Sequence, residues 1–203
     1  MIVIGITGGV GCGKSEVLRY LKEKYQAQVL LADEVANELK EPGMPCYQPV
    51  IDCLGEEILD ADGRIDKGKM AQVIFSDREK LRKINEIIHP AVRRYIEQEI
   101  ERQRKIKMFG FFFLEAALLI EEHYDQLLDE MWYVYATEEV RRTRLMQSRG
   151  YSQEKTTSII NKQLTEQQFR QHCSFVLDNS GDFEHTKKQI DEKMGVYLCR
   201  EQM

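Results

Sequence analysis

The sequence predicts an α/β protein in which a parallel five-stranded sheet carries helices on both faces. Short apolar segments alternate along the chain with longer segments of helical character, which implies a doubly wound sheet. All but one of the apolar segments are nearly continuous runs, as is typical of strands buried on both faces. The expected strands are Ile2–Ile6, Gln28–Ala32, Met108–Leu114, Met131–Tyr135 and Phe175–Leu177.

The segments between the strands predict helices. The longest is Glu79–Lys107, which is rich in charged residues and carries apolar residues at helical spacing. Pro90 interrupts it, and we expect a helix start or a kink there. Ser152 is a good N-cap for a helix over Ser152–His172, and a last helix is expected over Glu184–Cys199.

The spacing of the strands indicates an insertion. About 75 residues separate the second strand from the third, which is too long for an ordinary crossover. We therefore expect one domain over residues 1–203, with a helical insertion over 44–104 beside the sheet.

Composition limits the partners. A net charge of −5 argues against a broad basic face for nucleic acid. The five cysteines form no C-x-x-C pair, which favours a reducing compartment. The chain shows no basic leader and no apolar run near the ~20 residues of a membrane helix. We expect a cytoplasmic monomer or weak homo-oligomer without nucleic-acid or membrane partners.

One motif carries most of the functional information. Residues 8–15, here called the phosphate loop, read Gly-Gly-Val-Gly-Cys-Gly-Lys-Ser and fit G-x-x-x-x-G-K-[ST] between a predicted strand and a predicted helix. Its glycines allow backbone N–H groups to approach phosphate oxygens, and the following helix directs its positive end at the same anion. Lys14 can reach the β- and γ-phosphates, and the Ser15 hydroxyl can bind Mg²⁺. The sequence therefore predicts a P-loop NTPase-like fold that binds a nucleoside triphosphate.

The remaining residues favour a small-molecule kinase among phosphate-loop proteins. The guanine-reading N-K-x-D of a GTPase is matched only by Asn161-Lys162-Gln163-Leu164, which ends in Leu and lies in a predicted helix. Asp33 follows the second strand, which we expect to neighbour the strand before the phosphate loop. Its carboxylate can accept the proton of a substrate hydroxyl. It can equally be the N-cap of a short helix.

The chain resembles the dephospho-coenzyme A kinase family over nearly its full length. The points of resemblance are the phosphate loop with its Thr7-Gly8-Gly9 opening, Ala32-Asp33, Glu41-Pro42-Gly43, Asp62-Gly63, His89-Pro90, Leu118-Leu119 with Glu121, and Asp178-Asn179 with Gly181. The resemblance implies that ATP and Mg²⁺ are used to phosphorylate the 3′-hydroxyl of dephospho-coenzyme A, with Asp33 as base or as the group that aligns the hydroxyl. It also implies a nucleotide-binding core over 1–43, 105–140 and 156–203, a substrate-binding insertion over 44–104 and a lid over 141–155.

The chain departs from the family pattern at several positions. Leu31 replaces the first Asp of an Asp-Ala-Asp, and Ala117 replaces a proline before Leu118. The acidic residue that precedes this proline position is Glu115 rather than Asp. Lys67 replaces an arginine that usually follows the Asp-Gly pair. Ser148 occupies the slot of the expected lid arginine, and Arg149 follows it, so we assign the lid role to Arg149.

The expected site residues fall into four groups. The catalytic residues are Lys14, Asp33 and Arg149. The nucleotide-binding residues are Gly9, Gly11, Cys12, Gly13, Lys14, Ser15, Glu16 and Asn179. The substrate-binding residues are Asp33, His89, Glu115, Leu118 and Leu119. Ser15 is the expected metal ligand.

Several of these residues have alternative interpretations. Asn179 is expected either to touch the adenine or to form an Asx turn. Cys12 is expected to be a small filler, with access to alkylating reagents as an alternative. Lys14 is expected to face solvent, so its removal leaves folding nearly intact. For Arg141 and Arg144 a solvated helix face is the preferred interpretation.

Two other functions are weighed against the kinase of dephospho-coenzyme A. One is a kinase of a different hydroxylated metabolite, such as a nucleoside or a shikimate-like acid. The other is a nucleotide-dependent binding protein without transferase activity, which only Leu31 supports. An acceptor panel with Mg-ATP distinguishes the three.

Overall fold

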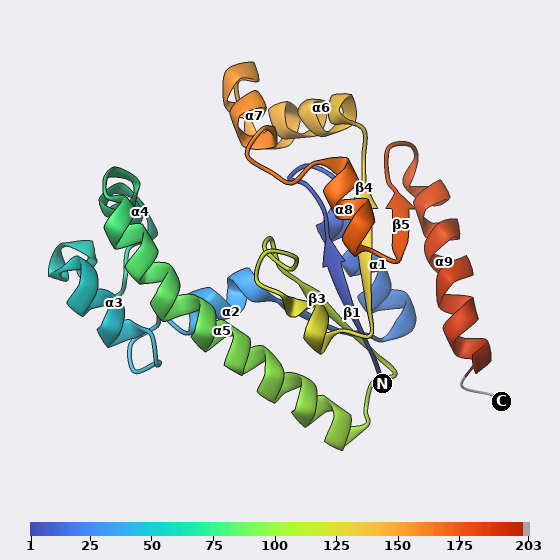
Figure 1. Cartoon of the computed structure of the whole chain (residues 1–203), viewed down its shortest axis with the longest axis horizontal. Coiled ribbons are helices and arrows are strands. Elements are labelled where there is room, and N and C mark those ends of the chain that lie inside the picture. The colour runs from blue at the N-terminus through green and yellow to red at the C-terminus, as the bar shows by residue number, and fades with distance from the viewer. Residues whose placement is uncertain (201–203) are drawn as a thin grey trace. The chain divides into compact units, whose positions relative to one another are not determined.

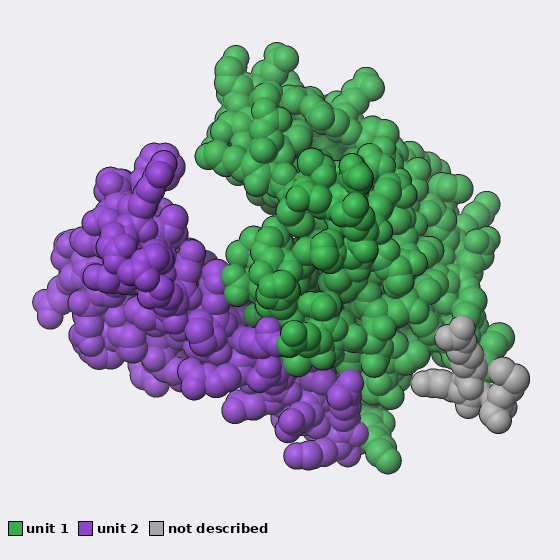
Figure 2. Space-filling model, viewed as in Figure 1, with its two compact units in different colours: residues 1–29, 107–203 green, residues 30–106 purple. Residues whose placement is uncertain are grey.

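The computed structural model describes residues 1–200 of the chain. It divides into two compact units (Figure 2). The first unit comprises residues 1–29 and the chain from residue 107 onward, and the second comprises residues 30–106. The finer division into core, insertion and lid stays a prediction.

The predicted parallel sheet is present (Figure 1), and all of its strands lie in the first unit except β2, whose last two residues are counted with the second unit. Within residues 1–200 the strands are β1 (Ile2–Thr7), β2 (Gln28–Leu31), β3 (Phe111–Glu115), β4 (Glu130–Tyr135) and β5 (Phe175–Asp178). The sheet order is β2-β3-β1-β4-β5. The expectation that the second strand neighbours the first is wrong, because β3 lies between them. In the parallel pairing of β1 with β3, Ile6 stands opposite Glu115.

The faces of the sheet are covered by different helices. Successive residues of a strand point to opposite faces, so Trp132 and Tyr133 of β4 identify the two sides. On the Trp132 side, Tyr197 of α9 (Phe183–Arg200) stacks on the indole at a centroid distance of 6.5 Å. On the other side, Phe169 of α8 (Glu166–His172) stacks on Tyr133 at 4.7 Å. Burial of both faces explains why these strands read as continuous apolar runs.

Helix α1 (Lys14–Tyr25) packs beside α9 on the Trp132 side, and Asp191 joins the two helices. The Asp191 carboxylate accepts hydrogen bonds from Tyr25 Oη at 2.6 Å, Tyr20 Oη at 2.8 Å and Lys24 Nζ at 2.7 Å. Burial alone would raise the pKa of Asp191, but these bonds outweigh it and hold the pKa below its ordinary value. Asp191 therefore stabilises the docking of α9, the last helix of the described chain, on α1.

The Asp191→Asn variant is expected to lose about 1–2 kcal/mol of unfolding free energy at pH 7, because an amide cannot accept the same set of charge-assisted bonds. A lowered folded-state pKa stabilises the fold above the ordinary value of 3.8 and ceases to do so as the pH falls through the folded value. Melting curves are therefore expected to separate wild type from the variant at pH 7 and to converge at a pH well below 3.8. Glu192→Gln, an exposed neighbour, is the control. A gap of the same size at both pH values would contradict this account.

Segment 137–172 differs from its prediction in one respect. Helix α6 (Glu138–Arg149) is capped by Thr137, and α7 (Gln153–Ile160) is capped by Ser152 as expected. The single helix expected over Ser152–His172 is wrong, because α7 ends at Ile160 and α8 starts after Thr165. Thr165 and Gln168 form a capping box, which satisfies the first amides of a new helix. Residues 161–164 are therefore a turn, not part of a helix.

The second unit is helical. Its elements are α2 (Ala32–Glu38), α3 (Tyr47–Leu54), the 3₁₀ turn η1 (Glu56–Ile58), α4 (Lys67–Ser76) and α5 (Arg78–Ile106). The other helices pack on α5, which buries Ile84, Val92 and Ile96. A helix start at Pro90 is wrong, because α5 runs without a break through that residue at the cost of one backbone hydrogen bond. In the described part of the chain no helix is long and apolar enough to span a membrane.

Candidate active site

The phosphate loop joins β1 to α1 in the first unit, as its motif predicts. Gly11 and Gly13 have φ of 84° and 91°, a left-handed backbone that residues with a Cβ rarely adopt. Gly13 is the N-cap of α1 and offers no side chain to the first turn of the helix. The N–H groups at the start of α1 therefore lack a side-chain cap, and an anion suits them.

Lys14 lies between the loop and β3. Its Nζ donates to the carbonyl of Gly8 at 2.8 Å and lies 3.6 Å from Oε1 of Glu115, the last residue of β3. The side chains of Lys14 and Glu115 are only 15% and 17% exposed. The expectation of a solvent-facing lysine is therefore wrong. Because β3 and not β2 neighbours β1, Glu115 is the carboxylate one strand away from the loop.

Asn179 supports the loop from within the unit. It follows β5 and is 1% exposed. Its Nδ2 donates to the carbonyl of Cys12 at 2.8 Å, and its Oδ1 accepts from Thr186 Oγ1 at 2.9 Å. Each end of the amide makes one bond inside the protein, and a contact of this residue with adenine stays a prediction. Asn179 holds the loop backbone in place, a buried role that its position after a strand did not reveal.

The thiol of Cys12 is sealed beneath the loop. Cys12 is 1% exposed, and burial raises the pKa of its thiol. Cys12 is the buried filler that was expected, and the alternative of alkylation is wrong, because alkylation requires an accessible thiolate.

Two arginines of α6 contact the loop, where a solvated helix face had been the preferred interpretation. Arg144 Nη1 lies 3.4 Å from the Cys12 carbonyl. Arg141 Nε donates to the carbonyl of Val10 at 3.0 Å. A Cβ on Gly9 would collide with the Arg141 guanidinium, so glycine at this position allows the arginine to lie against the backbone. The helical periodicity of α6 could not show this contact, because the loop is distant in sequence.

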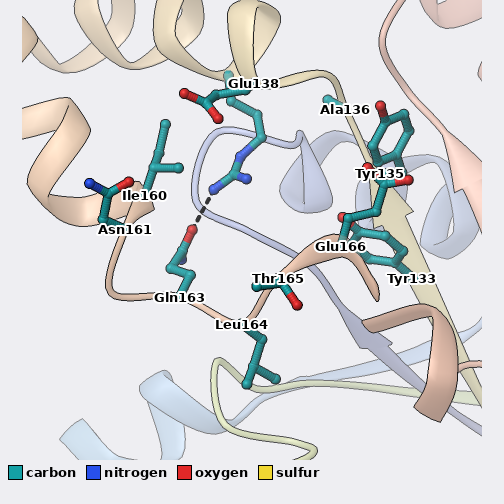
Figure 3. Close-up of a pocket in the computed structure, with 11 residues that line it drawn as sticks. Tyr133, Tyr135, Ala136, Glu138, Ile160, Asn161, Gln163, Leu164, Thr165 and Glu166 are labelled. Carbon is teal, nitrogen blue, oxygen red and sulfur yellow. Dashed lines mark hydrogen bonds between the residues drawn. The ribbon is translucent and has the colours of Figure 1, made fainter. Parts of the chain in front are cut away.

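Gln163 is the site residue that the sequence did not reveal. It lies in the turn between α7 and α8, within the Asn161–Leu164 segment that only resembles a guanine-binding motif. Its Oε1 accepts from Val10 N at 3.1 Å and from Arg141 Nη2. The dashed line at Gln163 in Figure 3 marks the bond to the arginine.

A pocket of about 390 Å³ opens beside this contact, between the end of β4, α6 and the α7–α8 turn (Figure 3). Tyr133 and Tyr135 form its aromatic wall, and burial raises the pKa of Tyr133 to about 12. Two glutamates line the pocket. Glu138 is paired with Arg142 and Glu166 with Arg170, so the negative charges of the glutamates are largely compensated.

The other predicted residues are distributed over both units. Asp33 is exposed in the first turn of α2, whose N-cap is Leu31, so the alternative N-cap role of Asp33 is wrong. His89 is half-buried within α5 of the second unit. Arg149 is the exposed last residue of α6, before Gly150 with a φ of 61°.

The paired leucines after β3 have different environments. Leu118 is 41% exposed, whereas Leu119 is fully buried against the strand residue Gly5. A side chain without exposed surface does not touch a substrate, so Leu119 belongs to the core and Leu118 alone stays a substrate-binding candidate. Ser15 and Glu16 lie in the first turn of α1, where Glu16 pairs with Arg19 at 3.6 Å.

The parallel sheet, the glycine-rich turn into α1 and the adjacent Lys14 define a phosphate-loop kinase of a small molecule. The family model described as dephospho-CoA kinase matches residues 2–185. The chain belongs to the dephospho-CoA kinase family, whose members phosphorylate dephospho-CoA with ATP in coenzyme A biosynthesis.

Individual relatives agree with this assignment. A dephospho-CoA kinase of Carboxydothermus hydrogenoformans is 38% identical over 188 residues, which cover 93% of this chain and 90% of the relative. A dephospho-CoA kinase of Aquifex aeolicus is 39% identical over 188 residues, which cover 92% of this chain and 93% of the relative.

Solved structures agree as well. A Thermus thermophilus crystal structure superposes with a TM-score of 0.80 at 30% identity and covers 96% of both chains. A Campylobacter jejuni dephospho-CoA kinase, at 19% identity and covering 99% of this chain and 98% of its own, has a TM-score of 0.71 and shows the shared fold. A shikimate kinase of Acinetobacter baumannii superposes with a TM-score of 0.58 at 12% identity. The match covers 100% of this chain and 96% of the shikimate kinase, and it likewise shows the fold alone.

Proposed function

We propose that this kinase transfers the γ-phosphoryl group of ATP to the 3′-hydroxyl of dephospho-CoA in one in-line step at the phosphate loop. The observation that carries the proposal is Lys14, held beside the loop by Gly8 and Glu115 in a member of this family. In this position its ammonium can exchange protein oxygens for the β- and γ-phosphate oxygens with little movement. The loop amides and the start of α1 supply further donors.

The step forms a bond between the acceptor oxygen and the γ-phosphorus and breaks the bond from that phosphorus to the bridging oxygen of ADP. The electron pair of the broken bond stays on ADP, and Lys14 compensates the developing charge. We assign Asp33 to accept the hydroxyl proton and to align the acceptor oxygen. Its exposed carboxylate in the first turn of α2 supports this role.

Mg²⁺ fits the loop as an ion shared with the nucleotide. In residues 1–200 no group of three or more His, Cys, Asp or Glu side chains could hold a metal by itself. Mg²⁺ commonly takes one or two protein ligands together with phosphates and water. Ser15 in the first turn of α1 would supply the protein ligand, and the bound ion would neutralise phosphate charge.

The remaining assignments concern the acceptor and the surroundings of the reaction. We assign His89, Glu115 and Leu118 to acceptor binding. We assign Arg149 to a lid that is formed by residues 141–155 and excludes water from the reaction. A cytoplasmic location, a monomeric or weakly oligomeric state and the lack of nucleic-acid partners stay predictions.

An acceptor panel tests the proposed reaction. Purified protein with Mg-ATP is offered dephospho-CoA, shikimate, adenosine or no acceptor, and ADP release is followed. We expect sustained turnover with dephospho-CoA alone. Turnover that requires a different acceptor, or no acceptor-dependent turnover at all, would contradict the proposal.

A further inference from the structure

Gln163, Arg141 and Val10 form a closed ring of hydrogen bonds, of which Figure 3 shows the bond between Arg141 and Gln163. Gln163 Oε1 accepts from Val10 N at 3.1 Å and from Arg141 Nη2, and Arg141 Nε donates to Val10 O at 3.0 Å. Both polar backbone groups of Val10, the third residue of the phosphate loop, are therefore bonded to side chains. These side chains come from α6 and from the α7–α8 turn, which are distant from the loop in sequence.

The turn that carries Gln163 does not need this side chain for its own shape. Lys162 N donates to Ile159 O at 3.3 Å, and Gln163 N donates to Ile160 O at 3.1 Å. The following helix starts with its own capping box at Thr165. The amide of Gln163 therefore acts on the loop and not on its own turn.

External support of this kind can preorganise a phosphate loop. A glycine-rich backbone has many accessible conformations, and ordering them costs free energy when a ligand binds. A bond that involves the guanidinium charge is stronger than a neutral one, so the Arg141–Gln163 contact orients both groups. Gly9 leaves room for the guanidinium, which fixes this arrangement directly beside the first residues of the loop.

We propose that Gln163 is a positioning residue that holds Val10 and Arg141 so that the loop is preorganised for the triphosphate of ATP. The inference rests on the proposed function only in requiring that the loop binds ATP. It is independent of the acceptor and of Asp33.

The test measures ATP binding without acceptor, by calorimetry, for wild type, Gln163→Met and Gln167→Met. Methionine keeps the length of the side chain and removes the acceptor oxygen. Gln167 is an exposed glutamine on α8, so the same change there is the matched control. We expect Gln163→Met to bind ATP about tenfold more weakly, or about 1.4 kcal/mol. Gln167→Met is expected to bind like wild type, and all three proteins are expected to melt within about 2 °C of one another.

Steady-state kinetics, and the same substitution made in an Arg141→Met variant, test whether Gln163 acts through the loop and Arg141. We expect Gln163→Met to raise KM for ATP about tenfold, with kcat and KM for dephospho-CoA within about threefold of wild type. In an Arg141→Met background the same change is expected to have less than about a threefold effect, because the ring is already open. Gln163→Asn, which is one methylene shorter, is expected to behave like Gln163→Met.

Three results would overturn the inference. The first is unchanged ATP affinity in both Gln163 variants, and the second is an affinity loss that only accompanies a large fall in melting temperature. The third is an equal effect of Gln163→Met with and without Arg141. If wild type itself does not bind ATP, the proposed function fails as well, and this result is separate from the other three.

Discussion

The Lys14→Met variant is expected to lose about 10²–10³-fold in kcat, because it removes a positive charge directed at the transferring phosphoryl group. ATP binding is expected to weaken less, since the loop amides and the start of α1 remain. Initial rates at saturating Mg-ATP and dephospho-CoA measure the effect. A kcat within tenfold of wild type would contradict the assignment.

The same substitution is expected to destabilise the fold, since Lys14 and Glu115 are both largely buried and 3.6 Å apart. Removing the ammonium deprives the Glu115 carboxylate of this cation, at a cost of about 1–3 kcal/mol. The double variant Lys14→Met/Glu115→Gln is the control. It is expected to recover most of the melting temperature without recovering kcat. Recovery of both would show that the single variant had lost activity by unfolding.

The Asp33→Asn variant is expected to lose about 10²–10⁴-fold in kcat, with KM for ATP nearly unchanged, because an amide cannot accept the hydroxyl proton. Asp33 is exposed in the first turn of α2, so the loss of helix-dipole stabilisation is expected to cost at most about 1 kcal/mol. Steady-state rates together with melting curves separate the two effects.

Two variants complete the Asp33 experiment. Glu34→Gln changes the exposed neighbouring carboxylate and is expected to leave kcat unchanged. Glu115→Gln tests the carboxylate that the strand order brings next to β1. A loss of less than tenfold for folded Asp33→Asn, or a larger loss for Glu115→Gln, would remove Asp33 from the base role.

The features that sequence predicted well are local. Each strand and the phosphate loop are specified by residues within a few positions, and the structure confirms them. The strand order was predicted wrongly at β2, because the pairing of Ile6 with Glu115 joins distant segments and has no local pattern. The turn before Thr165 was readable in principle, since Thr165 and Gln168 fit a capping box.

The support of the site was the part that sequence did not predict. Arg141 and Gln163 meet at Val10 only after α6, α7 and the sheet have assembled. The bond from Asn179 to the Cys12 carbonyl likewise joins segments that are distant in sequence. Residues that touch phosphates follow a motif, whereas residues that hold the motif in place are selected by tertiary contacts and carry no fixed spacing.

A single-turnover reaction with γ-labelled ATP tests the central claim most directly. Enzyme in excess over labelled Mg-ATP is mixed with dephospho-CoA, and the products are separated by chromatography and mass spectrometry. We expect the label to appear on coenzyme A, at its 3′-position, in amounts equal to ADP. Label recovered as inorganic phosphate, or on any other position of the acceptor, would contradict it.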